Sequence, residues 1–307
     1  MDPVIVLFGL GVGLLVGTTG MGGGSLMTPL LILVFGIKPV VAVGTDLSYA
    51  AVTKTVGGWR HLRKGTVDRP LAVWLAAGSV PGAIGGVALL SVIRHAAGRG
   101  FNDLLVVLIA GALLLTGLLV LLRALLLTEQ RQRERASIDP LQLHHKLAAV
   151  ALGLSVGCVL GVTSAGSGTL IAVGLIIGFR LTPRRVVGTD VFHAAILLWA
   201  AALAHLVSGD VDLGLAANIL VGSLPGVWIG SNLSSRLPER GLRPALAIVL
   251  LTSGLALLSQ AGVAIPVAAL IAVPLLLIGL VWAVLHFRPR TDETPIPTAS
   301  LAPGVSR

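Results

Sequence analysis

Two aspartates lie within apolar stretches of this chain, and each ends the motif Val-Gly-Thr-Asp. They are Asp46 and Asp190. A carboxylate at membrane depth costs roughly 2.5–3.5 kcal/mol unless it faces a polar cavity or is protonated. One interpretation is a proton-coupling pair or a polar clamp on neighbouring loops, and the other is a pair of structural aspartates bonded to backbone amides. Tyr49 and His193 follow one turn later on the same side; His193 either accepts a proton near neutral pH or serves as a packed hydrogen-bond donor.

Two glycine-rich runs, at 17–25 and 161–169, have the composition of an anion site. Each run opens the apolar segment that follows it, so free amides and the positive end of a helix dipole would point into a cavity. The residues that we expect to bind substrate, through amides or hydroxyls, are Thr19, Gly22, Gly23, Gly24, Ser25, Thr163, Gly166, Ser167, Gly168 and Thr169. The alternative is that the small residues only let helices pack closely.

The aspartates and the glycine runs belong to an internal repeat. A shift of 144 positions takes Asp46 onto Asp190, the first glycine run onto the second, and Gly-Ser-Val-Pro-Gly at 78–82 onto Gly-Ser-Leu-Pro-Gly at 222–226. An internal repeat of this length in an apolar chain is typical of a duplicated transporter fold. Pro81 and Pro225 are expected to kink the fourth helix of each half.

Composition identifies the class of protein. The chain is 55% hydrophobic and 11% charged, against about 25% charged for soluble domains. Its apolar stretches do not alternate, which argues against a transmembrane barrel. The net charge of +9 sits in short loops between apolar stretches, where it orients helices, so no nucleic-acid partner is expected. The single Cys158 excludes a disulfide framework, and neither a cofactor nor a metal site is predicted.

The glycine runs interrupt segments too short to cross a bilayer. The apolar segments are expected at 3–17, 23–37, 39–60, 70–93, 101–127, 145–161, 167–180, 183–208, 212–236, 242–260 and 263–287. A segment of about 15 residues covers ~22 Å, short of a hydrocarbon core of about 30 Å. Because exposed amides cannot face lipid, each glycine run is predicted to be the tip of a broken or re-entrant hairpin that lines a polar cavity.

Basic residues predict the orientation in the membrane. Five basic groups fall in alternate loops, which puts the N-terminus outside and the C-terminus in the cytoplasm of a multi-pass inner-membrane protein. Only the basic loop 94–99 falls on the wrong side. Each half has an odd number of crossings, so the second half is inverted, and a substrate site is expected near the midplane between the halves. Lys54 either attracts anions at the inner mouth or reaches out to the membrane interface.

The predicted fold class is all-α: a polytopic integral membrane protein built from two inverted repeats. Each repeat has a short-helix, glycine-rich hairpin and three transmembrane helices, and one further helix follows. The expected divisions are a first repeat at 1–127, a cytoplasmic linker at 128–143, a second repeat at 144–260, an additional C-terminal helix at 261–288 and a disordered tail at 289–307.

Three motifs carry a family resemblance: Gly-Met-Gly-Gly-Gly at 20–24 followed by Pro-Leu-Leu at 29–31, Ala-Val-Gly-Thr at 42–45, and Pro-Gly-Ala-Ile-Gly-Gly at 81–86. With their weaker second copies, they resemble the sulfite exporter TauE/SafE family of membrane permeases over about residues 4–287. This resemblance implies export or import of sulfite or a small organosulfur anion such as sulfoacetate. The chain departs from the family pattern after Gly-Thr, where Ser or Asn is frequent and both halves here have Asp.

The predicted function is therefore a secondary membrane transporter for a small anion, coupled to protons, and not an enzyme. The expected partners are that anionic substrate and the lipid bilayer. Two alternatives remain at this point. Two symmetric aspartates are compatible with an intramembrane aspartyl enzyme, in which close carboxylates share a proton, and a passive anion channel would have the same apolar character.

Overall fold

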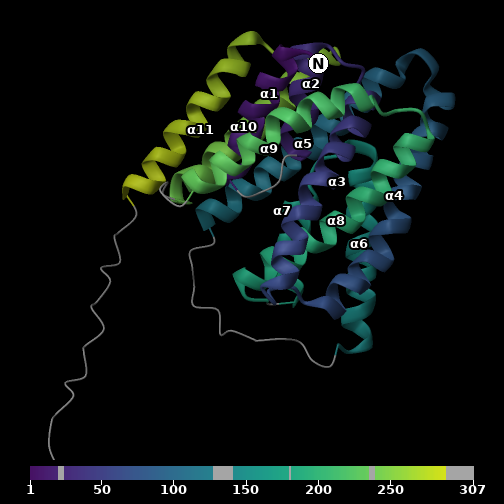
Figure 1. The fold of residues 1–307 in the computed structure, drawn as a ribbon. Helices are drawn as coiled ribbons and strands as arrows, with labels where there is room; N and C mark the ends of the chain where they lie inside the picture. The colour runs from purple at the N-terminus through teal and green to yellow at the C-terminus, as the bar shows by residue number, and fades with distance from the viewer. Residues whose placement is uncertain (20–23, 127–140, 180, 235–238, 288–307) are drawn as a thin grey trace, which may run out of the picture.

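The computed structural model describes residues 1–19, 24–126, 141–179, 181–234 and 239–287. Every element in these ranges is helical, which confirms the all-α prediction (Figure 1). The helices are α1 (Pro3–Thr19), α2 (Gly24–Phe35), α3 (Pro39–Arg63), α4 (Arg69–Ala97), α5 (Phe101–Leu126), α6 (Leu143–Thr163), α7 (Ser167–Phe179), α8 (Pro183–Val207), α9 (Leu213–Ser234), α10 (Glu239–Gln260) and α11 (Val267–Phe287), with a 3-10 turn, η1, at Gly98–Gly100. Most of the linker and the whole of the tail lie outside the described residues.

The lengths of the helices fit a polytopic membrane protein. Four helical stretches in the described part are long and apolar enough to cross a membrane: Arg69–Ala124, which includes both α4 and α5, Leu143–Thr163, Arg184–Val207 and Leu213–Leu233. The second arms of the two expected hairpins, α2 and α7, have only 12 and 13 residues, or ~20 Å of helix. The first arm of the second hairpin, α6, has 21 residues and is longer than the predicted 145–161.

Glycines at every fourth position join the two halves in two close seams. In one seam, α1 packs on α9, and a Cβ on Gly13 would lie 2.5 Å from the Ser223 carbonyl oxygen. In the other, α6 packs on α4, and a Cβ on Gly86 would lie 2.5 Å from the Cys158 carbonyl oxygen. No side chain fits at such spacing, so these positions require glycine. Close packing is therefore the role of the seam glycines, which occupy positions 9, 13, 17, 222, 226 and 230 in the first seam and 78, 82, 86, 153, 157 and 161 in the second.

The motif Val-Gly-Thr-Asp fastens α3 and α8 to each other's connecting loops. The Asp212 amide donates to Thr45 Oγ1 (3.1 Å), and the Asp68 amide donates to Thr189 Oγ1 (2.9 Å). These two bonds are equivalent under the repeat. Asp212 and Asp68 in turn cap the first turns of α9 and α4. The start of α3 thus meets the end of α8 and the reverse, so the two helices run antiparallel.

The remaining helices complete the bundle around these contacts. A Cβ on Gly117 of α5 would lie 2.9 Å from the Leu251 side chain of α10, so these repeat mates also pack together. Helix α11 lies on the outside beside α10, and α4 and α6 lie at the opposite edge (Figure 1). Pro81 and Pro225 lie inside helices that continue past them, and their predicted kinks stay a prediction.

Candidate functional site

Asp46 is completely buried and is held by two hydroxyl groups from different parts of the chain. Thr28 Oγ1 and Ser164 Oγ each donate to Asp46 Oδ2 at 2.6 Å, and the two hydroxyl oxygens lie 2.7 Å apart. The other carboxyl oxygen, Oδ1, is buried without a hydrogen-bond partner. Thr28 belongs to α2 and Ser164 follows α6, so Asp46 on α3 joins the two halves. This arrangement has the form of the polar clamp that the sequence offered as one interpretation.

The second glycine run provides the break that meets Asp46. Helix α6 ends at Ser164, which adopts a left-handed conformation (φ 57°), and α7 begins three residues later. Gly166 also has a positive φ (95°). A Cβ on Gly166 would lie 3.0 Å from Thr116 Oγ1 of α5, and that hydroxyl is buried and unpaired among the described residues. The first turn of α7, where amides lack helical partners, therefore begins beside an unsatisfied hydroxyl group.

The other expected substrate-binding residues are placed unevenly. The Thr163 hydroxyl donates to the Val159 carbonyl of its own helix (2.7 Å), which removes it as a free donor. Ser25, Gly168 and Thr169 are half-buried near the starts of α2 and α7. Gly22 and Gly23 lie outside the described residues. The same holds for the side chains of Thr19 and Ser167, and Gly24 is placed only as the first residue of α2.

Asp190 has charged surroundings instead of hydroxyl groups. Its side chain is buried, its Oδ1 has no hydrogen-bond partner, and the positive charges of Lys54 and Arg123 act on it. Lys54 is only 9% exposed, so the protein covers most of its side chain. The sequence favoured the membrane interface over the inner mouth for Lys54, and it used Arg123 only as one of the basic residues that orient the helices.

The two aspartates do not form a dyad. A Cβ on Gly57 would lie 3.0 Å from Val191, so Asp190 lies beside the α3 turn that contains Gly57. Asp46 lies about three helical turns earlier on α3, ~16 Å along the axis. Carboxylates that share one proton must lie about 3 Å apart, so the geometry contradicts the enzyme alternative.

His193 and Tyr49 are equivalent in the repeat, and each faces a serine of the fourth helix of the other half. His193 Nε2 lies 2.7 Å from Ser79 Oγ of α4 and is completely buried. This is the packed hydrogen-bonding role that the sequence weighed against proton transfer. The Tyr49 ring is also completely buried, and the side chain of Ser223 on α9, the repeat mate of Ser79, lies beside its hydroxyl.

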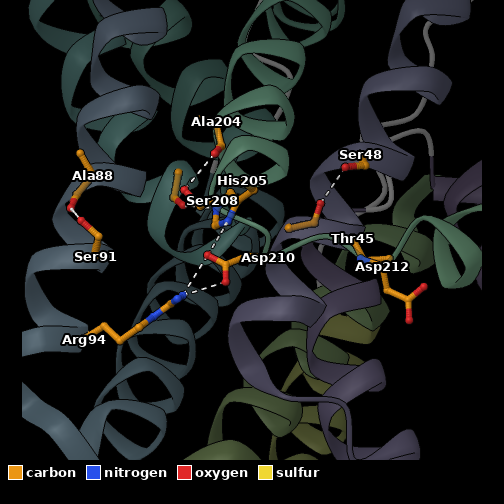
Figure 2. Close-up of polar contacts among 12 residues, drawn as sticks. Thr45, Ser48, Ala88, Ser91, Arg94, Ala204, His205, Ser208, Asp210 and Asp212 are labelled. Carbon is orange, nitrogen blue, oxygen red and sulfur yellow. Dashed lines mark hydrogen bonds and ion pairs between the residues drawn. The ribbon is translucent and has the colours of Figure 1, made fainter.

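A polar chain at the α8–α9 loop leads from the surface towards the glycine break. Arg94 of α4 binds both carboxylate oxygens of Asp210 (2.8 and 2.9 Å), and His205 Nδ1 lies 4.0 Å from Asp210 (Figure 2). His205 Nε2 contacts the Gly161 carbonyl at 2.8 Å. The same view shows Thr45 of α3 beside Asp212 of the α8–α9 loop, whose amide donates to the threonine hydroxyl. Arg94 belongs to the basic loop 94–99, which the predicted topology puts on the outer side of the membrane. Asp210 neutralises the charge of Arg94.

The sequence also missed two hydroxyl groups of the candidate site, one beside Asp46 and one beside Gly166. Thr28 and Thr116 are isolated polar residues within apolar segments, and that isolation was the available signal. Ser164 lay inside the second glycine run but was not selected. In the described part of the chain, no group of three or more His, Cys, Asp or Glu side chains could hold a metal ion.

Comparison with known proteins gives consistent matches over this architecture. Residues 5–257 match the sequence profile of a family described as "Sulfite exporter TauE/SafE". The chain is 40% identical over 269 residues to "Probable membrane transporter protein YjnA" of Bacillus subtilis (strain 168), covering 84% of this chain and 100% of the relative. It is 30% identical to "Probable membrane transporter protein YdhB" of the same organism (83% and 98%), and 28% identical to a "Probable membrane transporter protein" of Xylella fastidiosa (77% and 87%). No solved structure gives a significant match.

Proposed function

The chain belongs to the sulfite exporter TauE/SafE family and is a multi-pass membrane transporter, not an enzyme, and from this premise we propose that it carries a small anion by proton-coupled secondary transport. Sulfite or an organosulfonate is the proposed substrate. The observation that carries the proposal is the meeting of Asp46 with the second glycine break through Ser164 Oγ, at 2.6 Å.

The start of α7 supports the anion part of the proposal. The first amides of a helix point outward without partners, and the helix dipole adds positive potential there. The buried, unpaired Thr116 hydroxyl beside Gly166 offers a further donor. A small oxyanion needs several hydrogen-bond donors and no side chain in its way, and glycine at position 166 leaves that space.

Counting hydrogens at Asp46 supports the proton part. Three oxygens, from Asp46, Thr28 and Ser164, make three mutual contacts of 2.6–2.7 Å. The two hydroxyl groups supply two hydrogens, and a proton on the carboxyl group would supply the third. No cation among the described residues pairs with Asp46. An anion at the start of α7 would be repelled by the ionised carboxylate, so we expect anion and proton to bind together.

The helix packing supports an inverted repeat. Repeat mates α3 and α8 run antiparallel, and so do α5 and α10: Gly117 meets Leu251, while Gly254 meets Leu114. A two-fold axis perpendicular to the helices would produce this pairing. In that arrangement the halves 1–127 and 144–260 exchange orientation, as alternating access requires.

Ion pairs support the proposed orientation in the membrane. Arg185 pairs with Asp68 at 3.5 Å, so the basic groups near the α3–α4 loop and near the start of α8 share one end of the molecule. We assign that end to the cytoplasm. The exception, Arg94, is paired with Asp210 at the other end, and a neutralised arginine no longer opposes the assignment.

The direct test is reconstitution of the full chain in liposomes and uptake of labelled sulfite with and without a pH gradient. Saturable uptake that rises with the gradient, and competition by sulfoacetate, would support a proton-coupled carrier. Uptake that follows membrane potential and ignores the gradient would identify the channel alternative. No uptake of sulfite and no competition would remove the substrate assignment.

Matched variants extend this test to the site. Asp46→Asn should abolish the response to the gradient, because an amide cannot exchange the proton. Asp103→Asn removes a carboxylate from the exposed first turn of α5 and should leave uptake unchanged. Equal loss in both variants would contradict a specific role for Asp46.

A further inference from the structure

We propose that His205 is a second proton-binding residue of the transport cycle. Its Nδ1 takes up a proton beside Asp210, at the end of the molecule that the proposed orientation places outside. This inference rests on the proposed function and deepens its proton coupling. Asp46 is the proton site between the halves, and His205 is the site that responds to the pH at the α8–α9 loop.

The hydrogen bonding of His205 determines which ring nitrogen is free. Nε2 lies 2.8 Å from the Gly161 carbonyl oxygen. Because a carbonyl oxygen can only accept, Nε2 carries a hydrogen and donates it, and Nδ1 of the neutral ring is a bare acceptor. This Nδ1 is buried and has no hydrogen-bond partner among the described residues. A proton on Nδ1 would turn it into the donor that a neighbouring carboxylate can bind.

Asp210 is the carboxylate that faces this nitrogen. Its Oδ2 lies 4.0 Å from His205 Nδ1, and its two carboxylate oxygens bind Arg94 at 2.8 and 2.9 Å (Figure 2). A bare nitrogen and a carboxylate oxygen are both acceptors, so the neutral ring has no bond to gain at this distance. A protonated ring would form an ion pair with Asp210 after an approach of about 1 Å.

The end of α6 also favours a positive charge on the ring. Gly161 lies in the last turn of α6, where carbonyl groups lack helical partners and the helix dipole is negative. The burial of the ring and the positive charge of Arg94 oppose protonation. A histidine between opposing influences of this kind is suited to gain and lose its proton near neutral pH.

Helices α3, α4 and α6 and the α8–α9 loop approach the ring. The contact with α3 is at Gly44, where an added Cβ would lie 3.2 Å from the His205 Cβ. The ionisable side chains that these elements carry near this end are Asp46 and Tyr49 of α3, Arg94 and His95 of α4, Cys158 of α6, and Asp210 and Asp212 of the loop. Among them, Asp210 and Arg94 act on the charge of the ring, so the proposal depends on that pair.

The bond to Gly161 connects His205 with the hydroxyl groups at Asp46. Ser164, which donates to Asp46 Oδ2 at 2.6 Å, follows Gly161 by three residues at the end of α6, or ~4.5 Å along the axis. The end of α6 therefore contacts both proton sites. Movement of the protonated ring towards Asp210 would act on the same short segment that holds Asp46.

The first half of the chain has a neutral version of this arrangement. The repeat mates of His205 and Asp210 are His61 and Thr66. The Thr66 hydroxyl donates to the His61 carbonyl (3.1 Å), so its oxygen can accept from His61 Nδ1 (2.9 Å). The neutral His61 ring thus has its partner, whereas His205 faces a carboxylate that only a protonated ring can bind.

The first test measures protonation directly and does not depend on transport. In the purified, full-length protein with ¹⁵N-labelled histidine, nuclear magnetic resonance distinguishes a bare Nδ1 from a protonated one. The signal that is absent from His205→Gln identifies the residue. We expect its Nδ1 to change reversibly from bare to protonated between about pH 8 and about pH 5.

Variants of the two charged neighbours should move this titration in opposite directions. Asp210→Thr, which copies the first half, should weaken the binding of the proton about tenfold, and Arg94→Gln should strengthen it, because it removes the opposing charge. Asp210→Glu keeps the carboxylate and should retain the titration. His95→Gln is the matched control, since it removes an exposed histidine of α4 and should leave the His205 signal unchanged. An Nδ1 that stays bare down to about pH 5, or titration that ignores Asp210, overturns the proposal.

Transport separates this inference from the proposed function. His205→Gln keeps an amide that can donate to Gly161, and it should move the half-maximal point of sulfite uptake by about one pH unit or more. Gradient-driven uptake with the same pH profile in the wild-type protein and in His205→Gln would overturn the inference and leave the proposed function standing. The expected titration of His205 in a protein that carries no sulfite would support the proton site and overturn the proposed substrate.

Discussion

Asp46 and Asp190 occupy equivalent positions in the two halves, but their surroundings have opposite chemistry. Asp46 accepts two hydroxyl hydrogen bonds from Thr28 and Ser164, and no cation of the described part of the chain forms an ion pair with it. Asp190 is acted on by Lys54 and Arg123. The repeat explains why both carboxylates exist, and it does not explain what each one does.

The difference arises from residues that the repeat did not copy. The positions equivalent to Thr28 and Ser164 hold Ala172 and Gly20, so no equivalent hydroxyl pair is available to Asp190. The position equivalent to Lys54 holds Leu198, so no equivalent lysine is available to Asp46. In contrast, the scaffold contacts Thr45–Asp212 and Thr189–Asp68 are equivalent in both halves. The two halves have thus kept the same contacts between helices and loops, while the residues around their two aspartates have become different.

The largest effect is expected in the scaffold, where the halves should behave alike. Gly86→Val and its repeat mate Gly230→Val each push a side chain into backbone, at Cys158 and Leu14 respectively. We expect each to cost about 3 kcal/mol or more and to lower the yield of folded, monodisperse protein about tenfold. Size-exclusion profiles of the two variants measure this.

Gly85→Val is the control for the seam variants. It lies beside Gly86 on α4, and a Cβ there has no heavy atom within 4 Å. Its profile should match that of the wild-type protein. Tolerance of valine at position 86 but not at 230 would mean that the two seams are not equivalent.

The next effect should separate the two aspartates. Asp46→Asn is expected to reduce gradient-driven sulfite uptake at least about tenfold, because the proton site is lost. Asp190→Asn should keep the ratio between uptake with and without the gradient, since Asp190 lies outside the proposed proton site of Asp46, Thr28 and Ser164. Measuring that ratio in both variants tests whether the two aspartates have different roles. Equal ratios would contradict a difference between them.

A smaller effect is expected from a single hydrogen bond to Asp46. Thr28→Ala removes one hydroxyl donor, worth about 1 kcal/mol, and should lower gradient-driven uptake about fivefold. Thr18→Ala is the matched variant, because its hydroxyl bonds only the Leu15 carbonyl of its own helix (2.9 Å). If the two threonine variants lose uptake equally, the clamp has no special role.

The smallest effect should come from the ion pair at the α8–α9 loop, which the first half replaces by His61 and Thr66. The Arg94 side chain is 41% exposed, and exposed pairs contribute less than about 1 kcal/mol. Arg94→Gln should lower the free energy of unfolding by no more than that, and 0.5 M salt should reduce the difference. Arg99→Gln, on the exposed turn after α4, is the comparison, and an equal shift in thermal unfolding would show that the pair contributes nothing.

The helices themselves were predictable because each has a local cause. Proline starts α3 and α8, and glycine breaks precede α2 and α7. The remaining helices follow from the length of their apolar stretches. Each expected segment agrees with its helix to within four residues at either end. The glycines were harder to interpret. Gly17 and Gly161 open the predicted anion loops, yet both pack against backbone in the seams, because a glycine carries no local sign of whether a helix or a ligand will approach it.

By itself, the sequence determined the helical membrane class, the repeat and the pair of buried aspartates, since hydropathy, spacing and identity are properties of the chain. The tertiary structure alone decided the partners of those aspartates. Ser164 reaches Asp46 from the other half, and Lys54 acts on Asp190 across two helices. Such contacts depend on how antiparallel helices are placed side by side, and residues more than a hundred positions apart give no local pattern that would reveal them.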